Sequence, residues 1–230
     1  MNKDYMEQAK EFDTFAEQSY PWKFIEKPTL DSILKEVVKP GIRTLDLGSG
    51  GGRIVRYIES LGVDQQNIVG IDHGKELVEI SKMRSPNANL MVGDITKIET
   101  FSDLKWNFNV VTSIHVFEHL DLEQLKNCLD TCYAKMEKGG LFVCLVGHPF
   151  RYIESSKYNN NYWYKQMTPW GKEVSHYHKK ISDYVNSFIS AGFKIEKMLE
   201  PKVVEEGKVD MAKFNDYDNS AFRLVFVASK

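Results

Sequence analysis

The sequence of 230 residues has no long hydrophobic run, few cysteines and no excess of one charge. Its longest clean apolar run, Leu141 to Val146, is far too short to span a bilayer, and residues 1–10 lack the apolar core of a signal peptide. A formal net charge of -2 gives no basic footprint for nucleic acid or an anionic membrane. We therefore expect a cytoplasmic protein with no membrane role, and the charge argues against nucleic acid as a partner.

The three cysteines are too few for a disulfide framework. Cys128 and Cys132 lie four residues apart on an expected helix, a spacing that could hold a metal ion. No second cysteine pair is present to complete such a site, so we expect buried, reduced thiols.

The rest of the chain is organised around residues 44–53, which read Thr-Leu-Asp-Leu-Gly-Ser-Gly-Gly-Gly-Arg. Residues 42–47 are predicted to form a buried parallel strand, and the glycines then allow a sharp turn close to a ligand. A helix is expected over residues 52–60, and its free N–H groups and positive dipole end favour a negatively charged ligand group. Strand, turn and helix predict the first unit of a Rossmann-like sheet.

Two cofactor classes use such a unit in different ways. Dinucleotide enzymes need G-x-G-x-x-G, but the third glycine place counted from Gly48 is Arg53. The pattern is instead acid-x-G-x-G-x-G, with Asp46 two places before Gly48. It resembles the first motif of class I S-adenosylmethionine (SAM) methyltransferases, in which this turn holds the methionine end of SAM. A nicotinamide-dependent oxidoreductase and an unliganded loop remain the alternatives.

A second predicted strand, residues 67–72, also ends in an acid. The carboxylate of Asp72 can accept two hydrogen bonds from a ribose diol, as in both NAD-binding and SAM-binding folds. Asp72 therefore indicates a ribose-containing cofactor without separating the two classes. The adjacent His73 would either flank an adenine or lie exposed in the turn.

A third predicted strand, residues 89–92, leads into Gly93, Asp94 and Ile95. This turn resembles the one with which class I methyltransferases bind adenine. The resemblance implies that Asp94 accepts from the adenine amino group and that Ile95 packs against the ring.

The alternation of strands and helices predicts one α/β domain over residues 1–230. Further strands are expected at residues 108–114, 141–146, 193–200 and 221–228, and further helices at residues 74–84 and 122–136. We expect a Rossmann-like, seven-stranded sheet, mostly parallel with an antiparallel last strand, and helices on both faces. Ligands would bind beyond the carboxyl ends of the strands, where the motif residues fall.

Residues 1–40 are predicted to form an N-terminal helical cap. Apolar residues of the first twenty repeat at helical spacing, and residues 12–20 resemble a stretch that closes over the SAM pocket of small-molecule methyltransferases. Tyr20 is therefore a candidate substrate-binding residue. The alternative is a helix that covers only the sheet edge.

Residues 148–180 are rich in aromatic residues and asparagine and show no clear period, which is typical of a lid or substrate loop. Residues 175–184 then lead into a helix that ends near residue 191. The candidate substrate-binding residues are Tyr162, Trp163, His176 and Tyr177. A loop packed on the sheet surface is the alternative.

From residue 44 onward the chain resembles a small-molecule class I SAM methyltransferase of the type 11/12 group. The motifs are LDLGSGGGR, GID, GDI, VFEHL, GGLFV and HYHKKISDYVNSFISAGFKIEKMLEP, with Lys179 where arginine is commoner. The resemblance implies SAM as cofactor and methyl transfer to an O or N atom of a small metabolite. The cofactor-binding residues it implies are Asp46, Gly48, Ser49, Gly50, Asp72, His73, Asp94, Ile95, Ser113 and Ile114.

A base is needed only if the acceptor atom must lose a proton, and histidine suits that role near neutral pH. The catalytic candidates are His115, His119 and His178, and His176 is a further histidine of this group. A second possibility is a divalent metal, because residues 115–119 resemble the E-x-x-E-H stretch of some quinone-biosynthesis and RNA 2′-O-methyltransferases. His115 replaces the first glutamate of that stretch, so we assign no metal ligand. Pure proximity catalysis is the third possibility.

Overall fold

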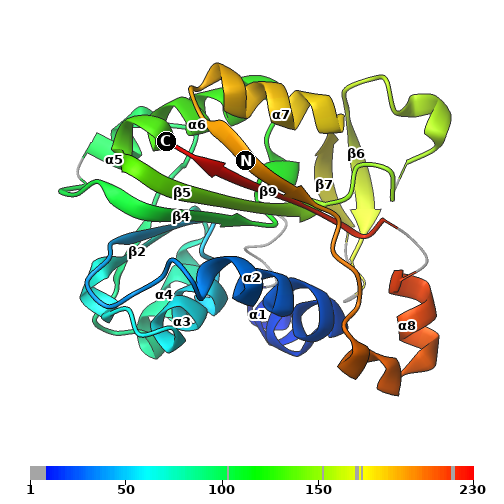
Figure 1. Cartoon of the computed structure of the whole chain (residues 1–230), viewed down its shortest axis with the longest axis horizontal. Coiled ribbons are helices and arrows are strands. Elements are labelled where there is room, and N and C mark those ends of the chain that lie inside the picture. The colour runs from blue at the N-terminus through cyan, green and yellow to red at the C-terminus, as the bar shows by residue number, and fades with distance from the viewer. Residues whose placement is uncertain (1–8, 103, 152, 169–170, 172, 219–220) are drawn as a thin grey trace.

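The computed structural model describes residues 9–102, 104–151, 153–168, 171, 173–218 and 221–230. A seven-stranded sheet with the order β3-β2-β1-β4-β5-β9-β8 forms its centre (Figure 1). The strands are β1 (Thr44–Leu47), β2 (Ile68–Asp72), β3 (Asn89–Val92), β4 (Phe108–Ile114), β5 (Met136–Gly147), β8 (Lys194–Leu199) and β9 (Arg223–Ser229). β9 lies between β5 and β8 and is antiparallel to both, whereas β1 to β5 pair in parallel. The predicted fold class is confirmed.

The order of the strands places the glycine turn in the middle of the sheet. β1 pairs with β2 on one side and β4 on the other, so that Leu47 faces both Ile71 and Ser113. The segments that follow β1 and β4 therefore begin side by side at the carboxyl ends of these two strands. In open α/β sheets a ligand crevice forms where the strand order reverses in this way.

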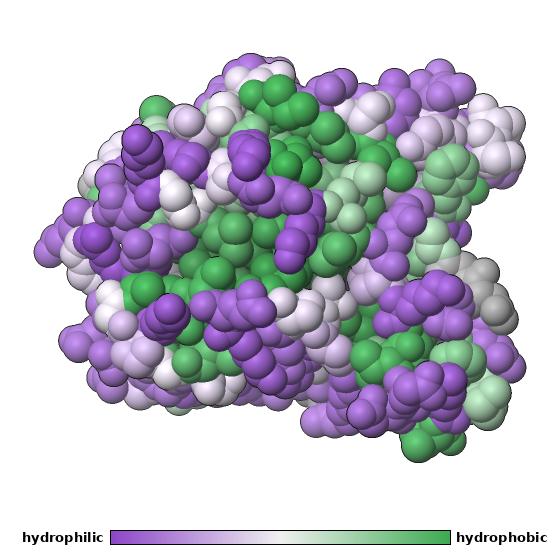
Figure 2. Space-filling view, in the orientation of Figure 1, coloured by the Kyte–Doolittle hydropathy of each residue, from purple (hydrophilic) through white to green (hydrophobic). Residues whose placement is uncertain are grey.

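Helices cover both faces of the sheet (Figure 1). The helices are α1 (Ala9–Gln18), α2 (Lys27–Leu34), α3 (Arg53–Ser60), α4 (Lys75–Arg84), α5 (Ile98–Ser102), α6 (Leu122–Lys135), α7 (Ile181–Ser190) and α8 (Met211–Asp218). One apolar core lies between the sheet and α2, α3 and α4, and the other lies between the sheet and α5, α6 and α7. The surface is mostly hydrophilic, with a band of apolar residues across the middle of the face in Figure 2. Among the described residues, every helix is too short or too polar to cross a bilayer.

The prediction of a loop over residues 148–180 is wrong in part, because this segment contains a β-hairpin. β6 (Tyr162–Met167) pairs with β7 (Glu173–His178) in a separate antiparallel sheet, and α7 begins only at Ile181. Tyr162, Tyr164 and Gln166 are half-buried, while the residues between them are exposed. This period of two is a strand pattern that aromatic composition masked. Residues 152, 169–170 and 172 of the predicted lid lie outside the described residues.

The start of the chain packs against a late segment. A π-helical turn (Trp22–Glu26) follows α1, and the apolar residues Tyr20, Ile25, Val203 and Phe222 form a third, small core. Short 3₁₀ turns complete the chain at Gln65–Asn67, Phe117–His119, Ser155–Lys157 and Glu205–Val209. Residues 1–8 of the predicted cap lie outside the described residues.

Phe188 should be a major contributor to stability, because its fully buried ring contacts the rings of Phe142, Phe193 and Phe226. We expect Phe188→Ala to lower the free energy of unfolding by about 3–5 kcal/mol, measured by urea denaturation. Ile189→Ala, at an exposed position of the same helix, should change it by no more than about 0.5 kcal/mol. Equal losses in the two variants would show that α7 is not held by this core.

Candidate active site

A cavity of about 480 Å³ opens at the carboxyl ends of the parallel strands. The glycine turn, α1, the turn after β4, the hairpin and residues before β9 all contribute to its wall. Twelve of the predicted site residues line it: Gly48, Ser49, Gly50, Asp72, His73, Ile95, Ile114, His115, His119, His176, Tyr177 and His178. Residues more than a hundred positions apart in the sequence therefore meet in one cavity.

Three residues predicted to contact substrate do not line the cavity. The Tyr20 hydroxyl donates to the backbone oxygen of Gly207 at 2.7 Å, and its ring stacks on Tyr217, so Tyr20 joins the cap to the late segment. Trp163 lies on the outer face of the hairpin and is 50% exposed. Tyr162 has the inward orientation of its strand, but its ring packs near His178 at the hairpin end.

Three residues predicted to bind cofactor, Asp46, Asp94 and Ser113, do not line the cavity. Asp46 and Ser113 are buried within the central strands. The Asp94 carboxylate accepts hydrogen bonds from the backbone N–H and hydroxyl of Thr96, at 2.9 and 2.7 Å, and so closes its own turn. A short acidic side chain after a strand often bonds locally in this way, and sequence alone does not distinguish that use from ligand binding.

The glycine turn is fixed by Asp72, whose two carboxylate oxygens accept backbone N–H groups. Gly50 donates to one oxygen at 2.9 Å and Gly74 donates to the other at 2.7 Å. Gly48 has a φ of 65°, and a Cβ there would clash with Val116. Asp72 therefore joins the turns that follow the first two strands, and glycine is required at position 48.

Helix α1 is held against the glycine turn by ion pairs that the sequence did not reveal. Asp13 forms a bidentate pair with Arg84, at 2.7 and 2.6 Å, and Glu17 pairs with Arg56. Arg53 donates to the backbone oxygen of Ala16 at 2.8 Å. Asp13, Phe15, Ala16 and Ser19 line the cavity as a result.

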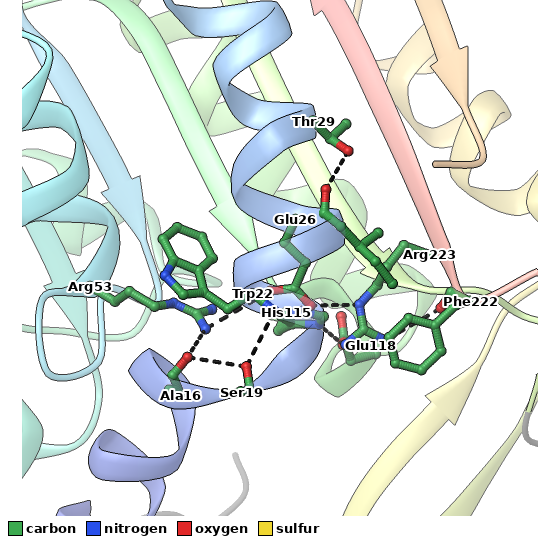
Figure 3. A network of polar contacts seen from close by, with 11 residues as sticks. Ala16, Ser19, Trp22, Glu26, Thr29, Arg53, His115, Glu118, Phe222 and Arg223 are labelled. Atoms are coloured by element: carbon green, nitrogen blue, oxygen red, sulfur yellow. Dashed lines mark hydrogen bonds and ion pairs between the residues drawn. The ribbon is translucent and has the colours of Figure 1, made fainter. Parts of the chain in front are cut away.

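A buried charge cluster lies beside this turn, as Figure 3 shows. Its centre is Glu26, which is 2% exposed and contacts His115 Nε2 at 2.8 Å and Arg223 Nε at 2.7 Å. Arg53 approaches the other carboxylate oxygen to 3.9 Å. Burial raises the pKa of Glu26, but His115 and Arg223 outweigh it and hold the pKa well below its usual range. No local pattern of the sequence indicates this cluster, because its members are far apart along the chain.

His115 lies between two carboxylates. Its Nε2 faces Glu26 and its Nδ1 faces Glu118 Oε1 at 3.1 Å, so both ring nitrogens are placed to donate. Burial lowers the pKa of His115, but these two carboxylates outweigh that effect and raise it overall. Its backbone φ of 61° is left-handed, an unusual conformation for a residue other than glycine. This histidine is best suited to carry a positive charge.

His119 and His176 have the opposite environment. Burial lowers the pKa of both, that of His176 to about 3, and their rings meet edge-on with centroids 4.7 Å apart. His119 Nδ1 donates to the backbone oxygen of Ser175 at 3.0 Å, because a carbonyl oxygen can only accept. The proton of the neutral ring is therefore on Nδ1, and Nε2 carries the lone pair.

His178 and Lys179 also line this part of the cavity. His178 Nε2 donates to the backbone oxygen of Tyr158 at 3.0 Å. Lys179 is 1% exposed, and its ammonium donates to the backbone oxygens of Leu120 and Tyr177. Burial lowers the pKa of Lys179 to about 7.

The described residues contain no group of three histidine, cysteine or acidic side chains that could hold a metal ion. Both ring nitrogens of His115 contact carboxylates, Nδ1 that of Glu118 and Nε2 that of Glu26.

Comparisons with known proteins fit this geometry. The methyltransferase domain family matches residues 45–144. A ubiquinone biosynthesis O-methyltransferase of Mesorhizobium japonicum is 31% identical over 116 residues, which are 48% of this chain and 43% of that enzyme. The crystal structure of a SAM-dependent methyltransferase from Mesorhizobium loti has a TM-score of 0.70 at 18% identity and covers 93% of this chain and 99% of that one. The match to residues 45–144 and the shared fold support membership of the class I SAM-dependent methyltransferase family.

The same matches support SAM as the cofactor. An uncharacterized protein of Haemophilus influenzae is also similar, 26% identical over 212 residues, which are 79% of this chain and 78% of that protein. This chain spans less than half of the length of the ubiquinone enzyme, 43%. The relatives therefore support the family assignment, and they do not identify the methyl acceptor.

The residues around the glycine turn fit SAM chemically. Asp46 Oδ2, Ser49 Oγ and Ser113 Oγ are buried and have no hydrogen-bond partner among the described residues. Burial raises the pKa of Asp46 to about 7, and a cationic ligand group nearby would offset that cost. Of the three, Ser49 lines the cavity, so its hydroxyl is placed to accept a hydrogen bond from the ammonium or a ribose hydroxyl of SAM.

Asp72 should be essential for cofactor affinity, because it orders the glycine turn and can accept from a ribose. We expect Asp72→Ala to weaken binding of S-adenosylhomocysteine by about 1.5–3 kcal/mol in calorimetric titration. Asp72→Asn, which keeps one acceptor oxygen, should lose less. Glu76→Ala, at an exposed position of the following helix, is the matched control. Unchanged affinity in the alanine variant would place the cofactor elsewhere.

His115 should remain protonated above the usual pKa of histidine. Since its folded-state pKa is raised, its share of stability is fully present below about pH 6.5 and is lost as pH rises through the raised value. NMR titration of the ring nitrogens should show the raised pKa of His115, and Glu26→Gln should lower it.

The Glu26→Gln variant should also lose about 3–5 kcal/mol of unfolding free energy, because Arg223 stays buried without its carboxylate partner. A His115 pKa at or below 6.5 in the wild type would contradict this account.

Proposed function

We propose that the chain transfers the methyl group of SAM to an O or N atom of a small metabolite, and that His119 removes the proton from that atom. The observation that carries the proposal is the state of His119. Its ring is neutral, its tautomer is fixed by Ser175, and it lines the same cavity as the glycine turn. A neutral imidazole in a substrate cavity is a suitable general base.

The other histidines suit this role less well. His115 is held as a cation by two carboxylates and has no lone pair to offer when protonated. His178 donates one ring N–H to Tyr158 and lies at the hairpin end of the wall. We assign His115 to positioning the turn that carries Glu118 and His119, and His176 to orienting the acceptor beside His119.

SAM supplies an activated methyl group on a sulfonium, so that the chain has mainly to bind and align the two reactants. We assign the glycine turn and Asp46 to the methionine end of SAM, Asp72 to the ribose, and His73 and Ile95 to the adenine. Asp94 remains a candidate for the adenine amino group only if its turn with Thr96 opens. Helix α1 would close over the cofactor, since its ion pairs hold it against the turn.

The acceptor would lie between the turn after β4 and the β6–β7 hairpin. Tyr164, Tyr177 and Phe222 line this part of the cavity and favour a partly apolar small molecule. The similar ubiquinone enzyme methylates oxygen by its name, which supports an O-methyl acceptor, including quinone precursors. The SAM cofactor sets aside the nicotinamide alternative, and an RNA acceptor finds no support in the net charge of -2.

Loss of His119 should abolish proton removal and leave cofactor binding intact. We expect His119→Ala and His119→Gln to lower kcat by about 10²–10⁴-fold, with unchanged affinity for S-adenosylhomocysteine. Transfer would be measured with isotope-labelled SAM and a panel of phenols and amines. In the wild type, kcat/KM should rise with pH and reach a plateau with a pKa below the usual 6.5, because burial lowers the pKa of His119.

The neighbouring His178→Ala is the matched control and should retain most of the kcat. A His119 variant with full activity would refute the base assignment but not the methyl transfer. Failure of the wild type to bind S-adenosylhomocysteine would refute the proposed function itself.

A further inference from the structure

Lys179 is a buried cation between the end of β7 and the start of α7. It is 1% exposed, and its ammonium lies 5.1 and 5.3 Å from the ring centroids of Tyr177 and Tyr184. Lysine is almost never fully buried unless its ammonium has partners, since the loss of hydration is costly. The proposed methyl transfer assigns this lysine no role.

The ammonium of Lys179 bridges two segments of the cavity wall. It donates to the backbone oxygen of Leu120, the residue after His119, and at 3.2 Å to that of Tyr177 in β7. The ring of His119 donates to the backbone oxygen of Ser175, two residues before Tyr177 on the same strand. The turn that carries the proposed base is therefore tied to β7 at two points, once by its own ring and once by Lys179.

The turn after β4 depends on such contacts because it is short. Residues 117–119 form a single 3₁₀ turn, whose own hydrogen bonds are few and have poor geometry. A hydrogen bond from an ammonium to a carbonyl oxygen is charge-assisted and stronger than a neutral one. The contact of Lys179 with Leu120 therefore fixes the backbone beside His119, and the contact with Ser175 then orients the ring.

The charge of Lys179 also acts on the neighbouring ring. Burial is the main cause that lowers the pKa of His119. Glu118 and the bond to Ser175 raise this pKa, whereas Lys179 and His115 lower it. Loss of the Lys179 charge would therefore make His119 easier to protonate.

Lys179 keeps its charge over the pH range that matters for His119. Burial lowers the pKa of Lys179 to about 7, although Glu118, Asp121, Cys144 and Asp183 act in the opposite direction. The pKa of His119 lies below the usual 6.5 of histidine. The ammonium is thus still protonated where the imidazole would begin to take up a proton.

We propose that Lys179 is a positioning residue, which holds the turn after β4 against β7 so that His119 faces the methyl acceptor. The inference rests on the proposed function, since it concerns the base of that site. Lys179 acts through the backbone of Leu120 and through its charge, and it needs no contact with the reacting atoms.

Three substitutions of Lys179 separate its hydrogen bonds and charge from its bulk. Lys179→Met keeps a long apolar side chain and removes the charge and the donors. Lys179→Gln keeps N–H donors without the charge, and Lys179→Arg keeps both. Lys165→Met, at a 67% exposed position of β6, is the matched control. The readouts are methyl transfer to the panel of phenols and amines, titration with S-adenosylhomocysteine, and NMR of the His119 ring nitrogens.

We expect Lys179→Met to lower kcat by about tenfold or more, with the acceptor KM and the affinity for S-adenosylhomocysteine within about twofold, because only the alignment of the base is lost. The pKa of His119 should rise, and its Nδ1–H tautomer should give way to a mixture. Lys179→Arg should restore most of the kcat and the single tautomer. Lys179→Gln should fall between them, and Lys165→Met should match the wild type.

Four results in Lys179→Met would overturn the proposal. They are an unchanged kcat, a raised acceptor KM at unchanged kcat, a lower kcat with the pKa and tautomer of His119 unchanged, and an equal loss of affinity for S-adenosylhomocysteine. The second would make Lys179 a substrate-binding residue, and the last would indicate general disruption of the cavity. If this variant does not fold, Lys179→Gln decides with the same readouts. If the wild type transfers no methyl group, the proposed function fails, and the NMR comparison still shows whether Lys179 positions His119.

Discussion

The buried carboxylate of Glu26 is the contact on which the shape of the cavity depends. It ends the π-helical turn, and its partners begin α3, begin β9 and follow β4, so one side chain joins four segments of the chain. A buried charge is costly unless it is paired, and three cationic groups here offset the cost. The cavity can therefore form only when the N-terminal segment has docked on the completed sheet. The left-handed backbone of His115 is maintained by the same contact.

Three histidines of this cavity have different protonation states because their surroundings differ. Two carboxylates keep His115 charged, and burial among other cationic groups keeps His119 and His176 neutral. Titratable neighbours whose pKa values are pushed apart in this way are typical of sites that move protons. The stretch from residue 115 to 119 thus contains a structural cation and a proposed base within two turns of chain. The residue types at positions 115, 118 and 119 alone do not indicate which histidine carries the charge.

Local patterns were sufficient to predict the sheet and the residues around the glycine turn that line one end of the cavity. The glycine turn, Asp72 and the residues at the strand ends follow from periodicity and turn chemistry, which act over a few residues. The pairing of Glu26 with Arg223 spans 197 positions and has no local signature. Tyr20 was misplaced for the same reason, since its partner Gly207 lies 187 positions away. In the hairpin, the alternation of half-buried and exposed residues favours Tyr164 and Gln166 over Trp163, but the aromatic composition of the segment obscures this period.

The family match and the acceptor wall occupy different parts of the chain. The match covers residues 45–144, which contain the glycine turn, Asp72 and the proposed base. The hairpin, Arg151, Lys179 and Phe222 all follow residue 144 and complete the wall that an acceptor would touch. The ubiquinone biosynthesis O-methyltransferase of Mesorhizobium japonicum is similar over only 116 residues, so the likeness between the two proteins is also partial. If the proposed function is right, the contacts that select the acceptor would then come largely from the later segment, whose aromatic side chains favour a partly apolar molecule.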